Sequence, residues 1–463
     1  MTSRVDTDRT TEPLLADLRA AIPAERVLRS GPAYDASVRQ FNDAIRTRPA
    51  VVVRCAATAD VQAAVRAARR SDVPLSVRGG GHDFWGRGLR EGGVVVDLTG
   101  MREVRVDGAA RVAEIGGGAL SSDLVGAAEE LDLTAVTGTA GSVGVLGLAL
   151  GGGYGPLIGR HGTAADNLLG ADVVLADGSR TVTDAEHEPD LLWALRGGGG
   201  NLGVVTSARL RLHPGATVVA GTVLYPLAQA GDVLRALDDA LHPAPDELSV
   251  DVGFVTAPDG SPAVLVSPTW SGDPAVGLAD DGPVHALARL STPLMAEIGP
   301  VPRSVTLDAV DALYPFGRRG AIRTRTVAGW TDPLVDVLEE SARSVTSPYS
   351  AILLHPFHGA ATRVPVGDTA FAARAPHLMI EVVALWESDD LDDDRHLAWA
   401  DRAHAALAPL SVPGGYVNVL GPEHVDQVDA AYGPNTERLL AVKAAYDPDS
   451  VFTATPLPGR AVR

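Results

Sequence analysis

Short apolar runs and helical spacings alternate along the first 214 residues. The run at 51–55 predicts a strand, and the apolar positions from Val61 to Ala68 recur at helical spacing. A second run at 75–77 completes a β-α-β unit over residues 50–78. Further strands are predicted at 93–98, 112–115, 169–175 and 203–212, and further helices at 14–22, 123–131 and 190–195. The pattern favours an α+β domain that ends at the Pro/Gly connector 213–215.

The middle of the chain has a different order of elements. Strands are predicted at 218–224, 248–255, 262–270, 351–356 and 378–386, and helices at 234–241, 284–290, 334–345 and 397–407. This order predicts one antiparallel sheet covered by helices. Two helical stretches are expected in the tail, residues 416–463.

Composition and charge narrow the possible functions. A chain of 463 residues predicts two or three domains, and 39 Lys and Arg against 58 Asp and Glu give a net charge of −19. This acidity disfavours nucleic acid and anionic membranes as partners. Cys55 is the single cysteine, so no intrachain disulfide is possible, and its place in an apolar run predicts an inert thiol. No metal site is predicted, because the 12 histidines are scattered.

The N-terminus has no apolar signal-peptide core, and no apolar run is as long as a membrane span. We therefore expect a cytoplasmic protein without a membrane partner.

Arg78-Gly-Gly-Gly-His82 directly follows a predicted strand. Consecutive glycines allow a sharp turn whose N–H groups form an anion-binding concavity, and a pyrophosphate is a common guest. His82, held against such a ligand, could serve as a nucleophile or an acid/base group. By itself the stretch fits better as a glycine turn before a strand, with His82 as a satisfied surface residue.

A second glycine-rich stretch, residues 137–170, strengthens the ligand interpretation. It is too apolar for a flexible linker, which would carry more serine and charge. Dense glycine among residues of buried type indicates backbone packed against a large flat ligand.

Other ligand motifs are absent or out of context. Gly198-Gly-Gly-Asn-Leu-Gly203 has the letters of a dinucleotide fingerprint, but it follows a predicted helix and enters a strand, the reverse of the required order. No glycine run is followed by a Walker lysine, and there is no G-x-S-x-G or H-E-x-x-H motif.

The motifs together, in their order and spacing, resemble those of the berberine-bridge-enzyme-like flavoprotein oxidases of the vanillyl-alcohol-oxidase superfamily. The stretches that carry this resemblance are 78–82, 138–155, 166–169, 176–178, 196–206, 416–418 and 446–448. The resemblance spans nearly the whole chain and implies FAD as the cofactor. It implies a PCMH-type FAD-binding domain in two subdomains, formed by residues 1–214 and 413–463. Residues 215–412 would form the substrate domain, an antiparallel sheet with helices on one face that roofs the flavin.

The resemblance also implies how FAD is attached and reoxidised. His82 corresponds to the histidine bonded to the flavin 8α carbon, whereas Ala140 stands where many relatives have a second, cysteinyl link. A single covalent bond through His82 is therefore expected. Val143 occupies the position of the family's oxygen gatekeeper, where valine resembles the oxidases and points to O2 as the electron acceptor.

Candidate catalytic residues come from two places in the chain. Tyr416 matches a tyrosine that several relatives use as a base, and Asn418 would hold Tyr416 or the flavin edge. Glu381 is a lone carboxylate in an apolar strand, which is costly unless it faces a polar site, and it is the first choice of base. Tyr416 could instead be a core tyrosine with a satisfied hydroxyl. Glu381 could instead lie on the solvent-exposed face of an edge strand. His355 and His358 could contact substrate or be structural.

The resemblance further implies a set of cofactor-binding residues. They are Arg78, Gly79, Gly80, Gly81, His82, Asp83, Gly86, Thr137, Gly138, Thr139, Gly141, Ser142, Val143, Gly144, Gly147, Gly152, Gly153, Tyr154, Gly155, Asp166, Asn167, Gly203, Val204, Val205, Tyr416 and Asn418.

We expect an FAD-dependent oxidase that removes a hydride from a small secondary metabolite, alcohol or sugar, with O2 giving H2O2. The alternatives are a flavin-containing sequestration protein with little turnover and a dehydrogenase with another electron acceptor. A monomer or homodimer is expected.

Overall fold

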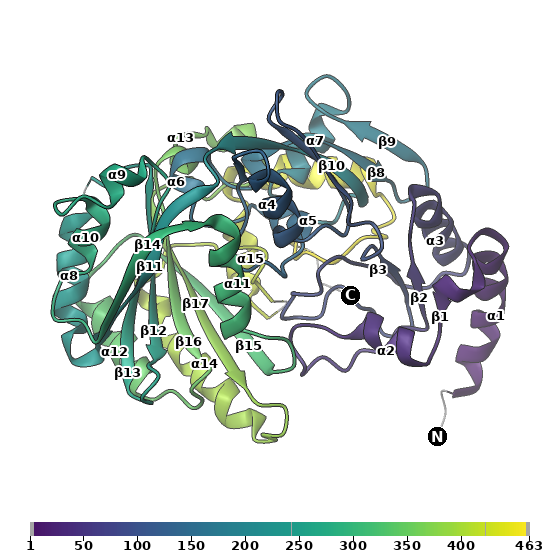
Figure 1. Cartoon of the computed structure of the whole chain (residues 1–463). Coiled ribbons are helices and arrows are strands. Elements are labelled where there is room, and N and C mark those ends of the chain that lie inside the picture. Colours follow the sequence, from purple (N-terminus) through teal and green to yellow (C-terminus); the bar gives the residue numbers. More distant parts are fainter. Residues whose placement is uncertain (1–3, 242, 422, 460–463) are drawn as a thin grey trace.

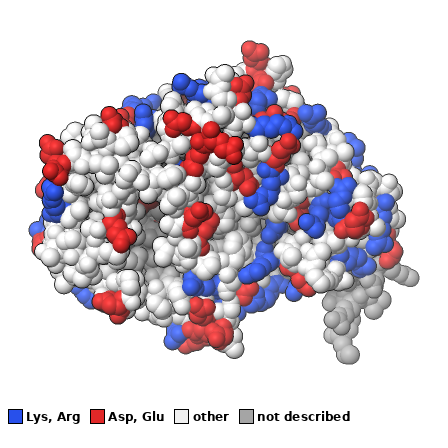
Figure 2. Space-filling model, viewed as in Figure 1, with Lys and Arg blue, Asp and Glu red and all other residues white. Residues whose placement is uncertain are grey.

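Three β-sheets organise the chain in the computed structural model, which describes residues 4–241, 243–421 and 423–459 (Figure 1). Two sheets belong to the part on the right and upper centre of Figure 1, and the third forms the part on the left. Helices alternate with the strands, so the predicted α+β class is confirmed. Acidic and basic side chains are interspersed over the face seen in Figure 2, and the negative net charge does not gather into one patch there.

The first sheet has the order β1-β2-β4-β3. Its strands are β1 Val27–Leu28, β2 Val51–Arg54, β3 Leu75–Arg78 and β4 Val94–Asp97, with helices α1 Arg4–Ala21, α2 Pro32–Val38 and α3 Thr58–Arg70. Strands β2 and β3 run parallel to β4 on its two sides, and α3 connects them as the predicted crossover. Since β3 ends at Arg78, the three glycines leave the sheet at its carboxyl end, where ligands of such sheets bind.

The second sheet has the order β5-β6-β10-β8-β9, with β7 pairing to β10. Its elements are β5 Val104–Asp107, β6 Val112–Gly116, α4 Ser121–Glu129, β7 Leu133–Ala135, α5 Val145–Leu150, α6 Ile158–His161, β8 Leu168–Val174, β9 Arg180–Thr183, α7 Pro189–Leu195 and β10 Val204–Pro214. Helix α5 lies inside the glycine-rich stretch and buries Val145 and Leu146 against this sheet.

The C-terminal tail returns to this part of the molecule. It forms α15 Val425–Ala431 and α16 Thr436–Tyr446, and Leu439 of α16 packs in the core of the second sheet. Lys443 is fully buried, donates to the carbonyls of Asn201 and Phe452 at 2.7 Å each, and pairs with Asp447. Because a buried ammonium is stable only with such partners, this contact fastens the tail to the loop before β10.

The third sheet is antiparallel throughout, with the order β14-β11-β13-β12-β16-β17-β15. Its strands are β11 Thr217–Pro226, β12 Leu248–Thr256, β13 Pro262–Trp270, β14 Met295–Pro302, β15 Arg319–Val327, β16 Ala351–Phe357 and β17 His377–Trp386. The helices of this part are α8 Ala230–Ala240, α9 Pro274–Gly277, α10 Pro283–Leu287, α11 Arg303–Leu313, α12 Asp332–Arg343, α13 Ala360–Arg363 and α14 Asp393–Leu407.

Helices α8, α10, α12 and α14 cover one face of this sheet and form its main core. Along β17, Ile380, Val382 and Ala384 point to these helices and are fully buried. Since side chains alternate across a strand, Glu381 and Val383 point to the opposite face, toward the first two sheets.

The two edge strands, β14 and β15, were not predicted from the sequence. β14 ends in Pro300-Val-Pro302, which is unusual except at a sheet edge. β15 carries arginines at alternate positions, and two of them pair with the covering helix α14: Arg319 with Asp393 and Arg323 with Asp401, each at 2.8 Å. These partners lie more than 70 residues away in the sequence. Without them the arginines indicate a solvent-exposed segment, so the strand was not recognised. Within the described ranges, no helix is both long and apolar enough to cross a membrane.

Candidate functional site

Two glycine-containing loops meet in front of the first sheet. A Cβ on Gly80 would lie 2.5 Å from the Gly144 nitrogen, and a Cβ on Gly144 would lie 2.8 Å from the Gly80 nitrogen. Gly81 also has a φ of +73°, in the left-handed region. Only glycine tolerates these positions, because any side chain would collide with the facing backbone.

The N–H groups of these loops are free for a ligand. In the part of the chain that the structure describes, no protein atom accepts a hydrogen bond from the backbone N–H of residues 79–83 or 138–144. Such groups need water or a ligand as acceptor. Rows of N–H donors on two facing loops suit a flat cofactor with a pyrophosphate, so the residues present fit FAD.

His82 lies at the junction of the two loops. Its ring stacks on Phe41 with 4.6 Å between centroids and meets the edge of Phe316. Its Nε2 is 2.8 Å from Ser142 Oγ, and Ser142 donates its hydroxyl proton to Asp311 at 2.6 Å. Burial lowers the pKa of His82 to about 4, so the imidazole is neutral near pH 7. Because the Ser142 proton is directed to Asp311, we assign the imidazole proton to Nε2, which leaves the Nδ1 lone pair available as a nucleophile.

Tyr416 and Asn418 face the glycine-rich stretch from the tail. Tyr416 Oη accepts hydrogen bonds from Gly153 N–H at 3.1 Å and from Asn418 Nδ2 at 2.8 Å. Asn418 also donates to the carbonyl of Leu148 at 2.9 Å. Burial raises the pKa of Tyr416, more than these donors lower it, so the phenol keeps its proton at neutral pH and can donate it into the site. Tyr154 packs edge-on against this ring, with centroids 4.7 Å apart.

Glu381 lies on the face of the third sheet that points toward the loops. On this face Val383 and Leu385 pack with Phe41, the residue that stacks on His82. Met379, on the other side of Glu381 along β17, packs in the cluster that contains Tyr416. Glu381 is therefore between the two apolar clusters that join the sheet to the loops.

His355 is beside Glu381, whereas His358 is not. His355 Nε2 lies 3.7 Å from Glu381 Oε2, and His355 Nδ1 lies 3.0 Å from Asp251 Oδ1. His358 follows the end of β16 and packs against Gly159, away from this group. The sequence analysis missed Asp251 and Asp311. Asp251 could have been found, because it is the one charge in the alternating apolar strand β12.

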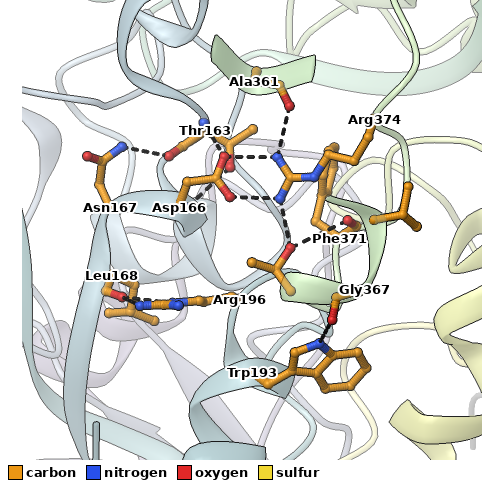
Figure 3. A network of polar contacts seen from close by, with 12 residues as sticks. Thr163, Asp166, Asn167, Leu168, Trp193, Arg196, Ala361, Gly367, Phe371 and Arg374 are labelled. Atoms are coloured by element: carbon orange, nitrogen blue, oxygen red, sulfur yellow. Dashed lines mark hydrogen bonds and ion pairs between the residues drawn. The ribbon is translucent and has the colours of Figure 1, made fainter. Parts of the chain in front are cut away.

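Other predicted cofactor residues have protein partners. Asp166 forms a two-pronged ion pair with Arg374, with N–O distances of 2.7 and 2.9 Å (Figure 3). Asn167 donates to the Thr163 and His161 carbonyls and lies 2.7 Å from His213 Nε2. Figure 3 shows both side chains inside a network of protein contacts. Their role in cofactor binding stays a prediction.

The remaining predicted residues fall into three groups. Arg78 and Asp83 are engaged in ion pairs, with Asp97 and Arg87 respectively. Backbone turns are formed by Gly86, Gly152 and Gly153, all with positive φ. The others belong to the loop after β3, to the glycine-rich stretch or to the start of β10: Gly79, Thr137, Gly138, Thr139, Gly141, Val143, Gly147, Tyr154, Gly155, Gly203, Val204 and Val205.

This fold and site together define an FAD-dependent oxidoreductase. Residues 49–184 match the FAD binding domain family, and residues 415–456 match the berberine and berberine-like family. The chain belongs to the berberine-bridge-enzyme-like family of FAD-linked oxidoreductases, with FAD as cofactor.

Among its relatives is an FAD-linked oxidoreductase of Gibberella zeae, 31% identical over 95% of this chain and 86% of the relative. The (R)-6-hydroxynicotine oxidase of Paenarthrobacter nicotinovorans is 28% identical over 93% of this chain and 96% of that enzyme. The crystal structure of 6-hydroxy-D-nicotine oxidase from Arthrobacter nicotinovorans has a TM-score of 0.83 at 28% identity, covering 93% of this chain and 96% of that one. Residue similarity thus extends across all three sheets.

Proposed function

We propose that the protein is an oxidase that removes a hydride from a small organic substrate and passes the electrons from FAD to O2, giving H2O2. The position of Glu381 carries this proposal. It is the carboxylate of β17 that points toward the loops, between the cluster joined to His82 and the cluster joined to Tyr416. A base at this position can take a proton from a substrate that lies between the sheet and the loops.

Different groups of the chain bind the cofactor, accept the proton and orient the substrate. The free N–H groups of residues 79–83 and 138–144 bind the cofactor, and the cofactor, when bound, supplies the hydride acceptor. Glu381 receives the proton that leaves the substrate together with the hydride. Tyr416, held by Gly153 and Asn418, donates its hydroxyl hydrogen and orients the substrate.

A single covalent bond would tie FAD to the protein through His82. The neutral imidazole with a free Nδ1 supports this, because a nucleophile needs an available lone pair. Ala140, in the facing loop, has no thiol for a second link. Val143 is next to Ser142 in this loop and supports O2 as the electron acceptor through its correspondence to the gatekeeper position of oxidases.

The test begins with acid denaturation of the purified yellow protein. We expect flavin to stay with the precipitate of the natural protein and of His187→Ala, an exposed-histidine control, and to be released from His82→Ala. Flavin in the supernatant of the natural protein would contradict the covalent link.

Turnover is tested with 6-hydroxynicotine as an amine probe and xylobiose and glucose as hydroxyl probes. The relative named for 6-hydroxynicotine motivates the first probe. We expect at least one of them to bleach the flavin under anaerobic conditions and to yield peroxide in air. Bleaching without peroxide would favour a dehydrogenase, and no bleaching would favour sequestration.

A further inference from the structure

Three charged side chains form a row across the third sheet, which we call the charge row: Asp251 of β12, His355 of β16 and Glu381 of β17. The pairing of Val252 with Leu354 places Asp251 beside His355. The imidazole then bridges the two carboxylates, with Nδ1 3.0 Å from Asp251 and Nε2 3.7 Å from Glu381.

The charge row faces the site and not the core. The neighbouring positions Val252, Leu354 and Ile380 point to the helices and are buried. The side chains of His355, Glu381 and Asp251 are 16%, 18% and 27% exposed, so each reaches solvent on the opposite face. Three ionisable groups on an inner sheet face cost free energy on desolvation, which indicates a role in binding or catalysis.

The environment favours a protonated His355. Burial alone would lower the pKa of His355, but the charges of Asp251 and Glu381 outweigh burial and raise it to about 10. Arg303 of α11 faces Asp251 from outside the sheet, and Tyr154 and Tyr416 face Glu381 from the loops. The two tyrosines are neutral at pH 7, so they do not compete with the imidazolium for Glu381.

We propose that Asp251 and His355 are positioning residues for Glu381, with the His355 ring held by Asp251 on one side and orienting the Glu381 carboxylate on the other. The proposal rests on the proposed function, in which Glu381 is the base. Asp251 fixes the ring through Nδ1, so that the Nε2–H group points toward Glu381.

The gap between His355 and Glu381 also suggests which substrate group fits. A distance of 3.7 Å is too long for a direct hydrogen bond, so both groups can contact one substrate hydroxyl that lies beside them on the exposed side of the charge row. Its oxygen would accept from Nε2–H while its proton passes to Glu381, breaking the O–H bond and forming an O–H bond on the carboxylate. FAD, when bound, would supply the acceptor for the hydride that leaves the same carbon, and the substrate would become a carbonyl compound. A protonated amine has no lone pair to accept from Nε2–H, so the charge row favours an alcohol over a protonated amine.

The first test needs no substrate. Histidine side-chain nitrogen NMR of the 15N-labelled holoenzyme is compared for the natural protein, His355→Gln, Asp251→Asn and the control His187→Gln. We expect one imidazolium signal to persist at pH 8.5, to vanish in His355→Gln and to remain in His187→Gln. In Asp251→Asn its midpoint should fall by about 1 to 3 pH units, the usual effect of removing an adjacent opposite charge. A neutral His355 at pH 8.5, or an unchanged midpoint in Asp251→Asn, would overturn the proposal.

The second test follows anaerobic flavin reduction by the probes named above as a function of pH. His355→Gln should slow reduction by about 10- to 100-fold, as expected when an oriented proton acceptor loses its partner. Asp251→Asn should move the alkaline fall of the rate to lower pH, because its His355 loses its proton earlier. Identical profiles in all variants would contradict the role of the row. If no probe reduces the natural protein, the proposed function fails while the NMR result still decides the charge row.

Discussion

Replacing Arg374 with methionine should destabilise the protein strongly. The burial and the hydrogen bonds of Arg374 determine how much unfolding free energy is lost. The Arg374 side chain is 2% exposed and that of its partner Asp166 is 9% exposed. Arg374 donates to both Asp166 oxygens, to the Ala361 carbonyl at 3.1 Å and to Thr369 Oγ1 at 2.7 Å (Figure 3). Methionine removes all four hydrogen bonds and leaves the Asp166 carboxylate buried with the Thr163 N–H as its remaining strong donor.

Removing one partner of a buried ion pair costs about 3–5 kcal/mol of unfolding free energy. For a cooperative unit of about 150–250 residues this lowers the thermal midpoint by roughly 6–20 °C. The assay is thermal unfolding of the holoenzyme followed by circular dichroism.

Arg363→Met is the matched control, because Arg363 pairs with Asp246 on the surface, where their side chains are 60% and 36% exposed. This pair should contribute little to stability, because solvent screens an exposed ion pair. Asp166→Asn combined with Arg374→Met should recover part of the loss, because no uncompensated charge remains. Equal midpoints for Arg374→Met and Arg363→Met would refute the reasoning. A lower flavin content of purified Asp166→Asn at an unchanged midpoint would instead place Asp166 at the cofactor.

Three further predictions concern the cofactor and pH. Asp311→Asn should lower the fraction of acid-stable flavin, because the carboxylate that orients Ser142 and hence the His82 tautomer is lost; an unchanged fraction would show that this contact has no part in attachment. Val143→Leu should slow reoxidation of reduced flavin by O2 in stopped-flow absorbance, and an equal rate would contradict the gatekeeper role. Burial, with neighbouring positive charge, lowers the pKa of His161 to about 3 and of His213 to about 4, so both stay neutral in the native state. The unfolded chain binds protons below about pH 6.5, so the stability present above that pH is lost as the pH falls toward 4. His213→Asn should flatten the fall of the thermal midpoint between pH 7 and 4.5, and an equally steep fall would contradict this.

Much of the third sheet was predictable, because its inner strands are short apolar runs and its helices have clear apolar faces. β15 was not, since its arginines read as solvent-exposed until Asp393 and Asp401 of α14 are placed opposite them. Asp251 was overlooked because its partner is also far away in the sequence. A carboxylate in a strand acquires a function only when a histidine about 100 residues later lies beside it.

The sequence by itself determined the class of the protein and the location of its loops. Arg78-Gly-Gly-Gly-His82 and the glycine-rich stretch are local signals, because close backbone approach excludes every side chain but hydrogen. Glu381 was also a local signal, as a lone charge in an apolar strand. Only the tertiary structure decided the partners. It linked His82 to Asp311 through Ser142, linked Glu381 to Asp251 through His355, and paired Asp166 with Arg374. These pairings depend on how strands and helices far apart in the chain are packed, and distances of a few ångströms between side chains are absent from any linear pattern.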